Sequence, residues 1–121
     1  MELTCLIVDD NHAFLRAASA RLEPQGVSVV GLASSGDEAV LLAEKLRPAL
    51  ALVDVQLDGE SGFDVARRLA GTERPPRVIL VSVRAEDDVA DMLADAPVEG
   101  FLPKQRLSAR AIRQILEGEQ R

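Results

Sequence analysis

Short apolar runs alternate with amphipathic segments along the whole chain, and this alternation constrains its fold more than any other feature. The apolar runs are predicted strands, at residues 3–8, 27–33, 48–53, 77–83 and 99–102. Between these runs and after the last one, apolar residues recur three or four positions apart, as one face of a helix requires. The predicted helices span residues 11–23, 35–46, 61–70, 86–94 and 108–116.

Near-continuous apolar strands that alternate with helices are typical of a parallel sheet with helices on both faces. We therefore expect an α/β fold, a doubly wound flavodoxin-like sheet of five parallel strands in the order 2-1-3-4-5. The chain has 121 residues, of which 47% are hydrophobic, so it can bury a core of ordinary size. A single domain over residues 1–121 is expected.

Charge and cysteine content argue against several classes of protein. The net charge of −6 disfavours nucleic-acid binding by this domain, because such binding depends on neutralising phosphates. The single cysteine, Cys5, lies within the first apolar run and fits a core position in a reducing compartment. That run is too short for a signal peptide or a membrane span, so a cytoplasmic protein with no membrane partner is expected.

Acidic residues stand at the ends of two predicted strands. Asp9 and Asp10 directly follow the first strand, and Asp54 directly follows the third. In a sheet of order 2-1-3-4-5, the first and third strands flank the point where the strand order reverses, and ligands bind there at the carboxyl ends of the strands. The three carboxylates are therefore expected to meet at one edge of the sheet.

Three carboxylates at the ends of two neighbouring strands need a cation, a raised pKa or a wide separation, and a hard divalent cation is the expected solution. Two carboxylates about 4 Å apart repel by roughly 4 kcal/mol at an effective dielectric constant near 20. Mg²⁺ is the expected ion, because it binds through one or two carboxylates together with water and phosphate oxygens. Ser82 and Lys104 follow at the ends of the last two predicted strands. A hydroxyl, an ammonium, a metal ion and a nucleophilic carboxylate are suited to phosphoryl transfer.

Taken together, these motifs resemble the receiver domain of bacterial two-component response regulators over essentially the whole chain. The motifs are Asp9-Asp10, Asp54, Asp58-Gly59, Ser82 and Gly100-Phe101-Leu102-Pro103-Lys104. The resemblance implies that Asp54 accepts a phosphoryl group from a histidine kinase or a phosphotransfer protein. It implies that Mg²⁺ is bound by Asp10, Asp54 and the backbone carbonyl of Gln56, with Asp9 acting through water.

The resemblance also implies a switch. Ser82 would be the hydroxyl switch residue, Phe101 the aromatic switch residue, and Lys104 the lysine that contacts the phosphoryl oxygens. Phosphorylation would then reshape the face formed by residues 86–94, the strand 99–102 and the last helix. Such a domain is a signalling module, not a turnover enzyme.

The sequence departs from the family pattern near Ser82 and Lys104. Val83 stands where the family usually has a small residue, and we predict that it crowds the pocket and slows the reaction with small phosphodonors. Many family members have a cis proline after the lysine, whereas Gln105 follows Lys104 here, so a cis bond is not assumed. Gln56 and Arg84 occupy positions that vary across the family and tune phosphate lifetime.

Other functions remain open. A degenerate receiver would bind a partner without phosphorylation. A haloacid dehalogenase-like phosphatase is disfavoured, because its second Asp is replaced by Gln56, and a flavin site is disfavoured because acids follow the first strand. We expect His12 to lie on the surface or at the rim of the pocket. Phe101 could alternatively be an ordinary core residue.

The sequence offers two further possible partners, a second copy of the chain and an effector domain. Acids line the predicted fourth helix, and arginines line the last helix and its approach. These charges suit either a homodimer through this face or a charged surface that is simply solvated. These residues are Asp87, Asp88, Asp91, Asp95, Arg106, Arg110 and Arg113. The chain stops soon after its last helix, so it is either a stand-alone regulator or a fragment that precedes an effector domain, which binds DNA in many relatives.

Overall fold

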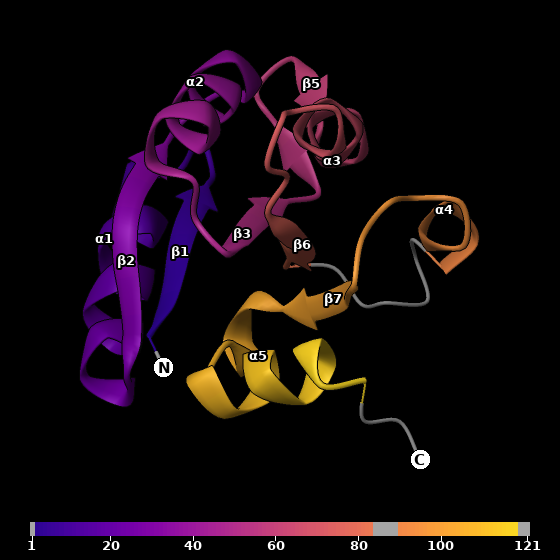
Figure 1. Cartoon of the computed structure of the whole chain (residues 1–121). Helices are drawn as coiled ribbons and strands as arrows, with labels where there is room; N and C mark the ends of the chain where they lie inside the picture. The colour runs from indigo at the N-terminus through magenta and orange to yellow at the C-terminus, as the bar shows by residue number, and fades with distance from the viewer. Residues whose placement is uncertain (1, 84–89, 119–121) are drawn as a thin grey trace.

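A central sheet of five parallel strands organises the molecule. The computed structural model describes residues 2–83 and 90–118. The strands lie in the order β2-β1-β3-β6-β7, which confirms the predicted order 2-1-3-4-5 (Figure 1). They span β1 Leu3–Val8, β2 Val27–Ala33, β3 Leu50–Asp54, β6 Arg77–Ser82 and β7 Gly100–Pro103.

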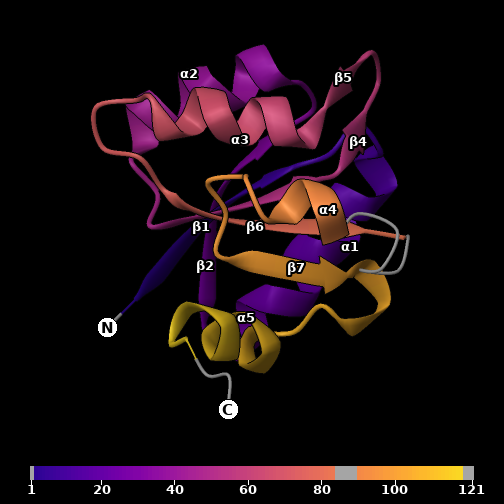
Figure 2. The ribbon, with the colours of Figure 1, turned by 90° about the vertical axis from the view of Figure 1, so that its right-hand side faces the viewer.

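The helices cover both faces of this sheet. They are α1 His12–Leu22, α2 Gly36–Leu46, α3 Gly62–Ala70, α4 Ala90–Leu93 and α5 Ala109–Leu116. Helices α2 and α3 lie on one face and α5 lies on the other (Figure 2). Four helix starts have a side-chain oxygen that accepts a backbone N–H, as helix N-caps do. The capping residues are Asn11, Ser35, Ser61 and Ser108.

The core consists of two apolar layers, one on each face of the sheet. One layer packs α2 and α3 against the sheet, and the other packs α1 and α5 against it. Every residue of β3 is buried, as expected for a strand at the centre of a parallel sheet. Cys5 lies in the second layer with no exposed surface, and burial raises the pKa of its thiol to about 12. Its predicted core position is confirmed.

The structure differs from the sequence prediction mainly just after β3. There the chain forms a small antiparallel hairpin, β4 Gln56–Leu57 and β5 Glu60–Ser61, which was not predicted as a pair of strands. The Asp58-Gly59 turn was predicted, and Gly59 has a φ of +77° at that turn. Two short 3₁₀ helices, η1 Glu23–Gln25 and η3 Lys104–Arg106, also join the predicted elements.

The predicted fourth helix can be compared with the structure only in part. It was expected over residues 86–94, and the structure has α4 at Ala90–Leu93. Residues 84–89, which include Arg84, Asp87 and Asp88, lie outside the described part of the chain. Within residues 2–83 and 90–118, none of the helices is long and apolar enough to cross a membrane.

Candidate functional site

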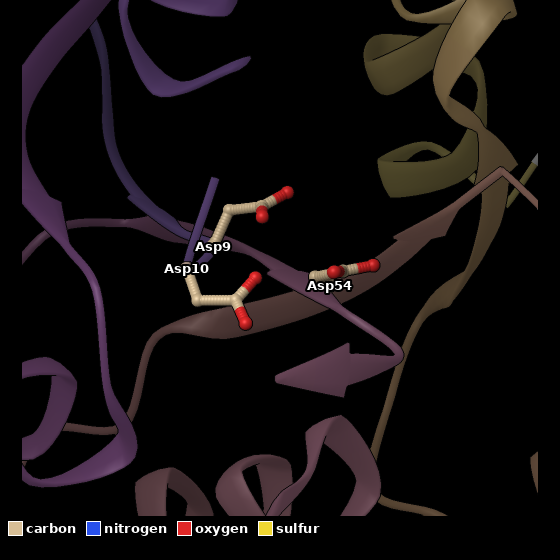
Figure 3. Close-up of side chains that lie close together, drawn as sticks. All are labelled: Asp9, Asp10 and Asp54. Atoms are coloured by element: carbon tan, nitrogen blue, oxygen red, sulfur yellow. The ribbon is translucent and has the colours of Figure 1, made fainter. Parts of the chain in front are cut away.

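Three acidic side chains meet at the carboxyl edge of the sheet. Asp9 and Asp10 follow the end of β1, and Asp54 is the last residue of the neighbouring strand β3. Each offers a carboxylate oxygen, and these oxygens all lie within 4.8 Å of one another (Figure 3). The expected strand order, together with the acids at the ends of two strands, had predicted that these carboxylates lie close together.

Backbone contacts hold Asp9 in place. Its N–H donates to the carbonyl of Ala33 in β2 at 3.0 Å, which continues the sheet pairing by one residue. Its Oδ1 accepts the N–H of Asn11 at 2.9 Å, and Asn11 in turn caps α1. Asp9 therefore has no exposed surface and is not itself the helix cap, whereas Asp10 is the most exposed of the three acids.

The chain turns sharply after Asp54, and a glycine makes this possible. Gly62, the first residue of α3, donates its N–H to the carbonyl of Val55 at 2.7 Å. A Cβ atom at Gly62 would lie 1.9 Å from the carbonyl oxygen of Asp54, which is far inside van der Waals contact. The close return of α3 onto the end of β3 therefore requires glycine at this position.

A second anchor holds the β4–β5 hairpin. The Glu60 carboxylate accepts the N–H of Gly36, the first residue of α2, at 2.8 Å. An anion is favoured at a helix N-terminus. Arg68 of α3 pairs with Asp37 of α2 at 2.8 Å, but the Asp37 side chain is 92% exposed, so this pair contributes little. The hairpin is thus tied to α2 as well as to α3.

Lys104 supplies the positive charge of the site. It follows β7, and its Nζ lies 2.6 Å from Asp9 Oδ2 and 3.8 Å from Asp54 Oδ2. Its Nζ also lies 4.2 Å from the centre of the Phe14 ring. Its side chain is only 15% exposed, so these charges interact with limited screening by water. The predicted placement of a lysine beside the acids is what the structure has.

Phe14 is the residue of this site that the sequence prediction missed. In the helical pattern of residues 11–23, Phe14, Ala18 and Leu22 lie four positions apart on one face, and no role in the site was predicted for Phe14. In the structure it lies in the first turns of α1, beside the rim of the site, with its ring against the Lys104 ammonium. The sequence signal for a role in the site was its position four residues after Asp10, and this position did not indicate a contact with Lys104.

The remaining predicted residues lie around the acids or behind them. Ser82 ends β6 and is 4% exposed. Phe101 lies in β7, 7% exposed, and packs in the apolar layer that includes α3. Gln56 is exposed in the first strand of the hairpin. The Lys104–Gln105 peptide bond is trans.

Two further residues lie at the rim. Val83 is 76% exposed and lines one hollow together with Phe14, Lys104 and Gln105. It therefore borders the approach to the lysine and is not packed among the acids. His12 is exposed and lines a separate hollow with Glu38, which agrees with the reading of His12 as a surface residue.

The electrostatics of the site favour a cation. Burial is the main cause that raises the pKa of Asp54 from 3.8 to about 6, and the Asp9 carboxylate adds to the rise while Lys104 opposes it. Among residues 2–83 and 90–118, three carboxylates face one ammonium here, so negative charge remains uncompensated by the described side chains. Converging carboxylate oxygens are the ligands that Mg²⁺ prefers in proteins, and the donor set therefore fits this ion.

Comparisons with known proteins agree with this geometry. The family model of the response regulator receiver domain matches residues 5–117. The chain is 34% identical over 119 residues to the response regulator GacA of Pseudomonas protegens, covering 94% of this chain and 55% of GacA. It is 30% identical over 118 residues to the transcriptional regulatory protein LiaR of Bacillus subtilis, covering 94% of this chain and 56% of LiaR.

Among solved structures, the fold is similar to a signal receiver domain from Mycobacterium tuberculosis that is assigned to the response regulator NarL. The TM-score is 0.82 at 27% sequence identity, with 97% of this chain and 95% of that one covered. The chain spans about half the length of GacA and LiaR. The sheet order, the acidic cluster and these matches together show that the chain belongs to the family of response regulator receiver domains.

Proposed function

We propose that Asp54 accepts a phosphoryl group from a histidine kinase or a phosphotransfer protein, and that the domain passes on a signal through a change of its surface. The observation that carries this proposal is the setting of Asp54. Its side chain is 12% exposed, so a phosphodonor can reach it, and it lies between two other acids and Lys104. A receiver domain of a two-component system implies a histidine kinase as partner.

The transfer balances as a simple displacement. A carboxylate oxygen of Asp54 forms a bond to phosphorus while the bond from phosphorus to the donor's imidazole nitrogen breaks, and the imidazole leaves with the electron pair. Asp54 must be ionised to attack, and its pKa of about 6 leaves it mostly ionised at neutral pH. Lys104 is placed to neutralise charge on the transferred oxygens.

Asp10, Asp54 and the backbone carbonyl of Gln56 would hold Mg²⁺ directly, with Asp9 acting through water. When bound, the ion supplies positive charge at the phosphoryl oxygens. Among these candidates, the Asp9 carboxylate already pairs with Lys104 at 2.6 Å, which suits a residue that acts at one remove from the ion.

Ser82 and Phe101 are the proposed switch residues. Ser82 ends the strand beside β3, and Phe101 lies in β7, where its partner across the sheet is Leu80 of β6. A phosphoryl group on Asp54 would draw the Ser82 hydroxyl toward it and change how Phe101 packs. The face formed by α4, β7 and α5 would carry that change to a partner.

Two further partners are proposed for this domain. A DNA-binding effector domain would follow this chain in a longer protein, an idea supported by its likeness to a transcriptional regulatory protein. A homodimer through α4, β7 and α5 is a second idea, but Arg113 donates to the carbonyl of Gly26 at 3.4 Å, so it is partly engaged within the chain. Sedimentation of both phosphorylation states at low and high salt tests the dimer.

The direct test is the intact mass after incubation with a small acyl or amido phosphodonor and Mg²⁺. We expect a single phosphoryl adduct in the wild type, none in Asp54→Ala, and none in the wild type with a chelator. Asp58→Ala is the matched control, because Asp58 is an exposed acid in the adjoining hairpin turn and should leave the adduct intact.

The second candidate function is a receiver that binds its partner without phosphorylation. The exposed Val83 beside Lys104 is the observation that favours it, because a branched side chain there narrows the approach to the lysine. Absence of an adduct in both the wild type and Val83→Ala would contradict phosphorylation and leave this candidate. An adduct that forms faster in Val83→Ala would support crowding in a competent receiver.

A further inference from the structure

We propose that Phe14 is a positioning residue that holds the Lys104 ammonium in the site through its aromatic ring. The inference rests on the proposed function, since it assigns a role toward the phosphoryl group on Asp54. It concerns a helix residue whose spacing to Ala18 and Leu22 indicated only a position on one face of the predicted helix.

The first step is the geometry around the ammonium. Lys104 Nζ lies 2.6 Å from Asp9 Oδ2 and 4.2 Å from the centre of the Phe14 ring. A cation within about 6 Å of a ring centre is attracted to the negative face of the ring. The ammonium is thus held by a fully buried carboxylate and by an aromatic ring at the same time.

The second step is what this holding achieves. Lysine has a long, flexible stem whose rotamer freedom opposes any fixed position of its charge. Asp9 alone would hold the ammonium near β1, while Asp54 Oδ2 is 3.8 Å away. The Phe14 ring restricts the stem and covers part of the ammonium, so the charge stays within reach of oxygens that arrive on Asp54.

The third step concerns water. Phe14 and Val83 line the same hollow as Lys104, together with the polar Arg21 and Gln105, so apolar side chains form part of the wall beside the lysine. Displacing water from a charged group strengthens its interaction with an anion, because the effective dielectric constant falls. The ring therefore contributes both position and a drier setting for the lysine.

A purely structural role for Phe14 makes a different prediction. In that case leucine, which keeps the apolar volume and suits a helix, would replace phenylalanine without effect on the lysine. Tyrosine keeps the aromatic face, so it should preserve the contact. The pair Phe14→Leu and Phe14→Tyr therefore separates a role of the ring from a role of apolar bulk.

The first measurement needs no phosphoryl group. The Cε protons of a lysine held against an aromatic ring show ring-current shifts in proton–carbon NMR spectra. We expect such a shift for Lys104 in the wild type and in Phe14→Tyr, and its loss in Phe14→Leu. A Lys104 signal that is the same in all three proteins would overturn the contact.

The second measurement is the affinity for beryllofluoride, a phosphoryl analogue, in the presence of Mg²⁺, with thermal unfolding as the control for folding. We expect Phe14→Leu to bind about two- to fivefold more weakly and Phe14→Tyr to bind as the wild type does. Equal affinity of all three variants would overturn the role of Phe14 while leaving the proposed function intact. No binding by the wild type would overturn both.

Discussion

Two strand-to-helix connections at the carboxyl edge of the sheet differ in how firmly their helices are held. After β3 the chain forms the β4–β5 hairpin and enters α3, whose nine residues include five that are buried. After β6 it leads to α4, where Met92 is 51% exposed and Leu93 is only partly buried. Both connections begin at a candidate site residue, Asp54 in one case and Ser82 in the other.

This difference suggests a division of work. The proposed acceptor and the hairpin next to it need a fixed geometry, because small displacements of reacting groups are costly. A surface that reports phosphorylation must instead have alternative packings that differ little in free energy. Deep burial of α3 serves the first requirement, and the shallow packing of the described part of α4 serves the second.

The largest expected effect compares core burial in the two helices. Leu69 in α3 has no exposed surface, so Leu69→Ala should lower the free energy of unfolding by about 3 kcal/mol. Met92→Ala, at a half-exposed position in α4, should lower it by about 1 kcal/mol or less. Urea unfolding of both variants is the measurement. Equal losses would mean that α4 is held as firmly as α3.

A smaller effect is expected from the close return of α3 onto β3. Gly62→Ala places a methyl group against the carbonyl oxygen of Asp54 and should cost about 2 kcal/mol of stability, with slower adduct formation at Asp54. Gly71→Ala is the matched control at the other end of α3. Its Cβ would lie 3.5 Å from the nearest atom, so its stability should change by no more than about 0.5 kcal/mol. Similar behaviour of the two variants would contradict the steric explanation.

The smallest expected effect is the pH dependence of stability that Asp54 causes. Its pKa is about 6 in the folded state and 3.8 in the absence of the fold, so the folded protein binds this proton more tightly. Stability from this group is therefore lost as the pH rises from about 4 through 6, and the loss is complete above that range. Water reaches part of the carboxylate, so the loss is on the order of 1 kcal/mol.

The measurement is urea unfolding of the wild type and Asp54→Asn between pH 4 and pH 8 without Mg²⁺. Asp54→Asn lacks the titrating group. Its free energy of unfolding should therefore rise relative to that of the wild type between pH 4 and about pH 6, and the difference should stay constant above that range. Adding Mg²⁺ at pH 8 should stabilise the wild type more than the variant. Parallel pH profiles would contradict a raised pKa at Asp54.

Much of the acidic site was predictable because a simple rule of parallel sheets places it. The carboxyl ends of parallel strands share one edge, so Asp9, Asp10 and Asp54 were expected together once the strand order was inferred. The same rule placed Lys104 on that edge. The rule says nothing about short irregular pairings, so the β4–β5 hairpin was read only as a turn.

The chain's own residue pattern determined which segments form strands and helices, which strands are buried on both faces and which strands end in acids, because burial and periodicity act over short stretches. The strand order was expected from the common doubly wound topology, and the pairing of distant strands in the structure confirmed it. Only the tertiary structure decided which side chains of other elements contact the residues at that edge. The contact of Phe14 with Lys104 and the bond from Gly36 to Glu60 join residues from different elements. Such contacts depend on how whole helices pack, and packing is decided by the complete set of neighbours at once.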